Sequence, residues 1–220
     1  MKRFLTAVLS LLSAASFAQY TPLGAVSSWT DGYIVTTQND TIRGKMRVGM
    51  LLNDAPQQVI FKQADGKKQT YKADNIVAIA QRIPFADESL NPQIRERQYI
   101  YFDKISHPRR NGKMLLTERL SRTTGKLALY FDASGWKQTQ EFSFGNFTIA
   151  TDPKDLSFVV VKRDAESFVV KRGNIQDHYE NLFGDCATFV KKYPDATRRD
   201  WNRFGELVDA YNSLCVVGLP

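Results

Sequence analysis

The chain has 220 residues, of which 43% are apolar, and its 30 lysines and arginines exceed its 23 acidic residues to give a formal net charge of +7. This apolar content excludes a disordered chain, and the length suits one domain with at most a small appendage. The two cysteines are too few for a small disulfide-dense scaffold.

The first eighteen residues have the pattern of a cleaved secretory signal. Lys2 and Arg3 precede an uncharged run over residues 4–15, FLTAVLSLLSAA, and residues 16–18, SFA, place small side chains at the positions that signal peptidase reads. The run is too short to span a bilayer as a helix, and no later stretch approaches 18 apolar residues. We therefore predict an exported protein that begins at Gln19 and has no transmembrane segment. It would reside in the periplasm, outside the cell or at the outer membrane.

Strand patterns dominate the first two thirds of the mature chain. Residues 19–31 are predicted to be an extended lead-in, followed by an antiparallel β domain over residues 32–172. Its first hairpin joins residues 32–37, GYIVTT, to residues 41–48, TIRGKMRV, through the turn sequence QND. The second strand alternates, because Ile42, Met46 and Val48 share one face while the other face carries Thr41, Arg43, Lys45 and Arg47.

A second hairpin is predicted over residues 59–62 and 69–72, with Asp65-Gly66 as its turn. A strand over residues 75–81 and a long surface loop over residues 83–97 follow. The remaining strands are predicted at residues 99–102, 114–119, 126–131, 141–149, 156–162 and 167–171. Such spacing predicts a mainly β (α+β) fold, in which an antiparallel meander closes as a barrel or folds as a two-layer sheet.

Near the C-terminus the spacing of apolar residues changes from the period of strands to that of helices. Apolar residues recur every three or four positions over residues 175–193 and 201–215, which predicts a tail of two or three helices over residues 173–220, packed on the β domain. Thr197 and Asp200 have the spacing of a capping box, so the last helix is predicted to begin there.

Cys186 and Cys215 are predicted to form a disulfide, because a lone pair of cysteines in an exported protein usually bridges. In a plain antiparallel helix pair they would lie about 15 Å apart, whereas bridged Cα atoms lie within about 7 Å. We therefore expect one of two arrangements. Either the first helix breaks at Gly184, with Asp185 capping a short second helix, or the helices cross steeply.

No catalytic or cofactor motif is present. The sequence has no nucleophile elbow, phosphate-binding glycine loop, EF-hand loop or dinucleotide fingerprint. His107 falls in a polar turn beside two arginines, and His178 is predicted to be a packed or partly exposed helix residue. Neither histidine has zinc-ligand spacing, so we predict no metal site and no cofactor. A glycosidase-like pair of carboxylates stays open, with these candidates: Asp132, Glu141, Asp152 and Asp155.

Residues 104–126 are unusually basic, with Glu118 as their one acid. Were they to share one end of the strand layer, they would form an anion-binding patch; the alternative is an ordinary solvated hairpin. An envelope protein, an anionic glycan or a lipid headgroup would suit such a patch, whereas export separates the protein from nucleic acid. The predicted patch consists of Lys104, Arg109, Arg110, Lys113, Arg119, Arg122 and Lys126.

Several segments resemble known exported proteins. Residues 32–46, GYIVTTQNDTIRGKM, and the tail motifs DC at 185–186 and YNSLC at 211–215 resemble Bacteroidetes-type exported proteins of unknown function, as do YKADNI at 71–76 and LALY at 127–130. The resemblance implies secretion and a β-rich domain with a helical end, and it implies no activity. Separately, Asp40-Thr41-Ile42 resembles the three-residue acceptor of bacterial O-glycosylation, which makes Thr41 a candidate modification site.

These patterns favour a non-catalytic exported protein of the cell envelope or periplasm, which binds a protein, glycan or lipid through its strands or loops. Two alternatives stay open. One is a secreted hydrolase that uses paired carboxylates. The other is a lipocalin-like carrier, which requires an apolar cavity inside a closed barrel.

Overall fold

The computed structural model describes most of the chain from residue 20 to residue 215. The described residues are 20, 22–52, 55–63, 65–83, 98–121, 125–133, 141–144, 147–150, 156–163 and 166–215, with only the backbone for 141–144 and 147–150. The predicted signal over residues 1–18 and nearly all of the predicted loop over 83–97 lie outside these ranges, so both stay predictions.

Twelve strands form within the described residues: β1 Thr30–Thr36, β2 Thr41–Leu52, β3 Ala55–Lys62, β4 Lys68–Lys72, β5 Ile76–Arg82, β6 Tyr99–His107, β7 Lys113–Arg119, β8 Leu127–Phe131, β9 Glu141–Phe144, β10 Phe147–Ala150, β11 Ser157–Lys162 and β12 Ser167–Lys171. Three α-helices follow them, α3 Tyr179–Phe183, α4 Ala187–Lys192 and α5 Phe204–Cys215, and short 3-10 turns occur at η2 Ala73–Asn75, η3 Pro108–Arg110 and η6 Trp201–Arg203.

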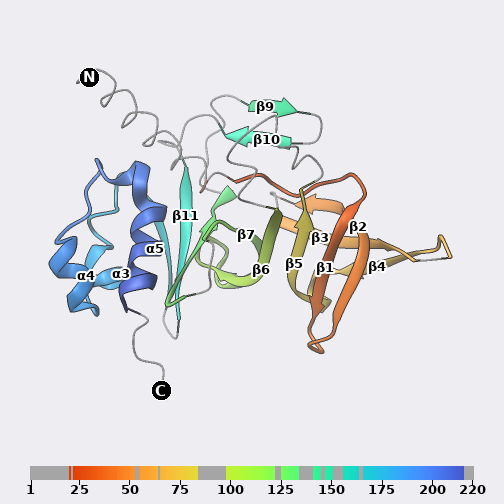
Figure 1. Cartoon of the computed structure of the whole chain (residues 1–220), viewed down its shortest axis with the longest axis horizontal. Helices are drawn as coiled ribbons and strands as arrows, with labels where there is room; N and C mark the ends of the chain where they lie inside the picture. Colours follow the sequence, from red (N-terminus) through yellow and green to blue (C-terminus); the bar gives the residue numbers. More distant parts are fainter. Residues whose placement is uncertain are drawn as a thin grey trace, which may run out of the picture.

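Ten of the strands form one antiparallel sheet in the order β12-β11-β8-β7-β6-β5-β1-β2-β3-β4. The predicted mainly β fold with a helical end is confirmed. Strands that are consecutive in the sheet's chain order lie side by side, with one exception. After β4 the chain returns across the sheet, and β5 pairs with β1 on the side opposite β2. The sheet is not closed, so of the two predicted forms the closed barrel does not occur. The helices and β1–β4 lie at opposite ends of the molecule (Figure 1).

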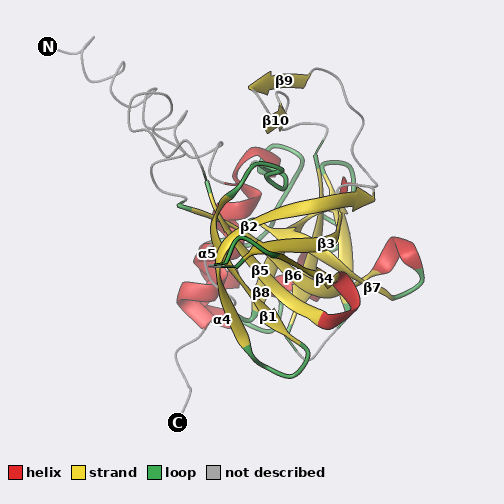
Figure 2. Cartoon of the chain, turned by 90° about the vertical axis from the view of Figure 1, so that its right-hand side faces the viewer, coloured by secondary structure: helices red, strands yellow, loops and turns green. Residues whose placement is uncertain are grey.

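Seven of the ten strands, β1–β7, curl around an apolar core. β3 lies against β7, although four strands separate them in the sheet. In Figure 2, which looks along the long axis, the strands accordingly curve around one another. We call the side that faces this core the inner face and the opposite side the outer face. The core consists mainly of Ile34, Met46, Val59, Phe61, Ile76, Ile79, Ile83, Ile100, Phe102 and Leu116.

Towards the other end of the sheet, from β6 to β12, the strands curl the opposite way. On β6 and β8 the side chains of Ile105, Ala128 and Tyr130 point to the outer face, since they alternate with inner-face neighbours, and they form a small cluster with Val159. The Ser167 hydroxyl of β12 donates to the Ser106 carbonyl of β6, 3.1 Å away. The outer face is therefore concave and enclosed near β12 but open over β1–β4.

The lead-in is tied to the sheet by two buried polar side chains. The Glu118 carboxylate accepts the backbone N–H groups of Leu23 and Gly24, at 2.8–3.2 Å. The Gln81 amide both donates to and accepts from the backbone of Val26. These bonds satisfy buried backbone groups of the lead-in, and the Val26 carbonyl also accepts the Val48 N–H of β2 at 3.2 Å.

The helical end packs on the inner face of β8, β11 and β12 and is joined by a disulfide. Cys186 and Cys215 are bridged with Cα atoms 5.9 Å apart, which confirms the predicted pair. The helix breaks at Gly184, as one of the two predicted arrangements required. Asp185 does not cap α4, however. Its carboxylate instead accepts the Tyr211 hydroxyl and lies 3.1 Å from Lys162 Nζ, so it links the break to α5 and β11.

Two further boundaries differ from the predictions. The single strand expected over 141–149 is a separate hairpin of β9 and β10, with Phe144 opposite Phe147. The intervening Gly145-Asn146 is a two-residue hairpin sequence that the strand prediction overlooked. The Thr197–Asp200 contacts form as expected, but a turn and η6 follow them, and α5 begins only at Phe204.

Candidate anion-binding face

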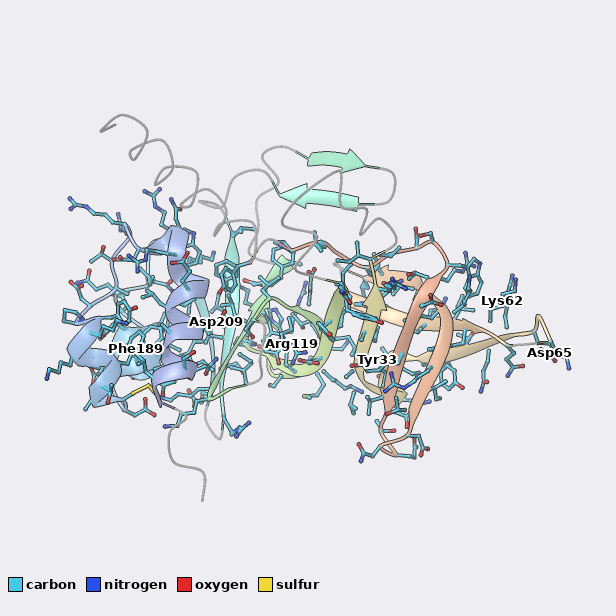
Figure 3. The ribbon with its side chains drawn as sticks, in the orientation of Figure 1. Tyr33, Lys62, Asp65, Arg119, Phe189 and Asp209 are labelled. Carbon is cyan, nitrogen blue, oxygen red and sulfur yellow. A yellow bond between two sulfur atoms is a disulfide. The ribbon has the colours of Figure 1, made fainter. Side chains whose placement is uncertain are left out.

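The outer face of β1–β4 carries every cation of these four strands, and we call this surface the basic face. Its residues come from alternate positions of each strand and therefore point away from the apolar core. In Figure 3 Lys62 and Tyr33 mark this end of the molecule, opposite Phe189 among the helices. The basic face has six cations: Arg43, Lys45, Arg47, Lys62, Lys68 and Lys72.

Three lysines of the basic face lie in one row across three neighbouring strands. In the register of the sheet Lys45 is opposite Lys62, and Lys62 is opposite Lys68. All three are exposed. Like charges placed directly opposite in a sheet are destabilising, by about 0.2–1 kcal/mol per pair. The row thus concentrates positive charge at some cost in stability.

Little negative charge offsets this surface. Asp31 is the only acid in β1–β4. It lies opposite Lys45, one strand beyond the lysine row, and its carboxylate is 3.9 Å from the Arg82 guanidinium. Within the described part of the chain, no ion pair joins any of the six cations to a carboxylate. The potential over this face is therefore positive.

Two aromatic rings hold the arginines of the basic face. The Arg43 guanidinium lies 4.8 Å from the centre of the Tyr33 ring, and that of Arg47 lies 5.2 Å from the Trp29 ring. Such stacking contributes about 0.5–1 kcal/mol at exposed sites. It fixes the position of each charge. The exposed Arg43 keeps its guanidinium N–H groups available to an anion, whereas Arg47 is half-buried and its Nε is enclosed.

Charges are paired where the outer face becomes concave. Arg119 stacks on Tyr101 and lies 3.5 Å from Asp103, whose carboxylate also accepts the Tyr130 hydroxyl. Burial raises the pKa of Asp103, and the nearby Arg119 only partly opposes it. Burial and Asp103 likewise raise the pKa of Tyr130. In this concave part of the outer face the charge of Arg119 is thus offset by Asp103.

The residues of the patch predicted over 104–126 lie in different environments. Lys104 is on the inner face and donates to the carbonyls of η2, and Arg119 is on the outer face. Arg109 is bound to Asp132, and Lys126 lies near Asp185. Arg109, Arg110 and Lys113 are exposed, and Arg122 lies outside the described residues. Anion binding by the predicted patch stays a prediction.

Asp132, one of the four candidate carboxylates, is fully buried and surrounded by donors. Its Oδ2 accepts Arg109 Nε at 2.8 Å and the Ser157 hydroxyl at 2.7 Å, while His107 Nε2 lies 3.4 Å from Oδ1. Burial alone would raise the pKa of Asp132, but the donors of His107, Ser157 and Arg109 outweigh it and lower the pKa to about 2. Because Ser157 donates to the carboxylate and not to the imidazole, this cluster is no catalytic triad.

The other predicted site residues are placed as follows. His178 is half-buried and contacts Phe168 and Asn174 at the start of α3, as expected of a helix histidine. Thr41 is exposed at the start of β2, and its glycosylation stays a prediction. Only the backbone of Glu141 is described, and Asp152 and Asp155 lie outside the described residues.

In the described ranges no three histidine, cysteine or acidic side chains come together as metal ligands. Searching the same ranges finds no helix with the length and apolarity to cross a membrane. Comparison of the chain with protein-family models, with curated proteins and with solved structures found no match in any of the three.

Proposed function

We propose that this chain is an exported, non-catalytic binding module of the cell envelope or periplasm, and that it holds an anionic partner on the basic face. The export part of the proposal rests on the N-terminal signal pattern and agrees with the disulfide at the helical end. The observation that carries the binding part is the unpaired lysine row of Lys45, Lys62 and Lys68.

The energetics of the row favour a binding role over a purely structural one. Charged residues on an edge strand such as β4 can serve to prevent sheet-to-sheet association. That role requires charge at the edge only, whereas Lys45 and Lys62 are on β2 and β3, inside the sheet. A row of three opposed cations is instead suited to an anion that bridges them, since the anion converts their mutual repulsion into attraction.

The binding test is a titration of the exported protein with dextran sulfate at several salt concentrations. We expect affinity to fall as salt rises, because bound counterions are released. Reversing two charges with K45E/K62E should weaken binding by at least about tenfold and lower the magnitude of the salt slope by about two. The matched control is K191E/K192E, which makes the same charge change on exposed residues of α4.

The same pair of variants separates binding from stability. In K45E/K62E the row from Asp31 to Lys68 still contains two like-charge pairs and one opposite-charge pair, as in the wild type, so the variant should unfold at about the same urea concentration as the wild type. Equal loss of dextran sulfate affinity in K45E/K62E and K191E/K192E would show that only net charge matters and would refute a specific face. Absence of binding by the wild type at low salt would refute the proposal altogether.

A further inference from the structure

Next to the basic face, β2 ends in three consecutive exposed apolar side chains. Met50 is 54% exposed, Leu51 44% and Leu52 57%. The other large apolar side chains exposed in the described residues, Val77 and Met114, are isolated on separate strands. A contiguous apolar group on the surface, bordered by polar residues, typically marks an interaction site. We call Met50, Leu51 and Leu52 the apolar tip.

The register of the sheet joins Met50, the first residue of the apolar tip, to the basic face. A shift in the pairing between Val48 and Met50 places Met50 opposite Gln58, and Gln58 is opposite Lys72. Met50 therefore shares the outer face with Lys72. Without this bulge, which occurs at Gly49, strict alternation would turn Met50 to the inner face.

This combination favours one class of anionic partner over another. A soluble polyanion would neutralise the six cations but would leave the apolar tip in water. A phospholipid surface satisfies both features, because its headgroup phosphates meet lysine and arginine while the acyl boundary takes up leucine and methionine. Trp29, stacked with Arg47 on the same side, has the amphipathic character of residues found at membrane interfaces.

We propose that the anionic partner of the basic face is the surface of an anionic phospholipid membrane, into which the apolar tip inserts. This inference rests on the proposed anion-binding function and adds the identity of the partner. The protein lies on such a membrane without spanning it. Each cation near an anionic surface strengthens attachment by about fivefold, and full burial of one leucine strengthens it by roughly tenfold or more.

Vesicle sedimentation tests the inference, with phosphatidylglycerol and phosphatidylcholine in about a 1:3 ratio as the anionic vesicles and pure phosphatidylcholine as the neutral ones. All proteins share the same N-terminus, verified by intact mass, so an uncleaved signal cannot create a difference between them. The tip variant is M50S/L52S. Its matched control is V77S/M114S, which also removes two exposed apolar side chains.

The inference predicts binding to anionic vesicles only, a loss of at least about tenfold in M50S/L52S, and no loss in V77S/M114S. M50S/L52S should keep its full affinity for dextran sulfate. Vesicle binding that is unchanged in M50S/L52S would overturn the inserted tip. Binding of the wild type to dextran sulfate but not to anionic vesicles would overturn the membrane partner while the anion-binding function stands. Binding to neither would overturn both.

Discussion

The buried carboxylate of Asp132 should make a large, pH-dependent contribution to stability. Its pKa is lowered from 3.8 to about 2 in the folded protein, which corresponds to about 2 kcal/mol of stabilisation at neutral pH. A carboxyl whose folded pKa is depressed stabilises the protein above its unfolded pKa. That contribution is lost as the pH falls through the folded pKa, so it should disappear between about pH 4 and pH 2.

The variant Asp132→Asn isolates this contribution, because asparagine is nearly isosteric with the protonated aspartic acid. The assay is urea unfolding of both proteins at several pH values between about 5 and 2.5. At the upper end the variant should be less stable by about 2 kcal/mol or more, since Arg109 loses its counter-charge. Towards the lower end the difference should shrink by about 2 kcal/mol.

Asp177→Asn, at an exposed site, serves as the control and should leave stability within about 0.5 kcal/mol at every pH. A stability difference between the wild type and Asp132→Asn that stays constant across this pH range would refute the reasoning, because the ionised carboxylate would then not be the group stabilised by its neighbours.

Three further changes test the helical end. Replacing Cys186 and Cys215 by serine should lower the free energy of unfolding by about 3–4 kcal/mol, and reductant should bring the wild type to the level of the variant. Asn212→Ala should cost about 2–4 kcal/mol in urea unfolding, because the amide of this residue pairs with both a backbone N–H and a C=O of β8. Gly205→Ala should destabilise the protein, since its Cβ would lie 2.3 Å from the Tyr20 ring. In a double-mutant cycle, Gly205→Ala should cost much less stability in the Tyr20→Ala background than in the wild type, because the ring that it would clash with is absent.

Sequence patterns located those features that depend on neighbouring residues. Asn39 and Gly66, both with positive φ, occupy the turns of the two predicted hairpins. The disulfide and the break at Gly184 followed from combining export with the reach of a disulfide. In each case a few adjacent residues determine the local backbone, so no knowledge of distant contacts was required.

The basic face depends on long-range register and could not be derived in the same way. Arg43, Lys45 and Arg47 were assigned to one face of their strand, but their alignment with Lys62 and Lys68 requires the pairing of β2 with β3 and of β3 with β4. Along the chain, the cations over residues 104–126 are more densely clustered than those of the basic face, so the sequence predicted an anion-binding patch there instead. They lie, however, on both faces of β6 and β7 or beside buried carboxylates.

Chemical-shift mapping tests the central claim, anion binding by the basic face, most directly. The backbone amides of the isotope-labelled exported protein are followed while a short sulfated oligosaccharide is added. We predict that the largest shifts occur on β2, β3 and β4 around Lys45, Lys62 and Lys68. Largest shifts on α3–α5, or around Arg110 and Lys113, would contradict the account.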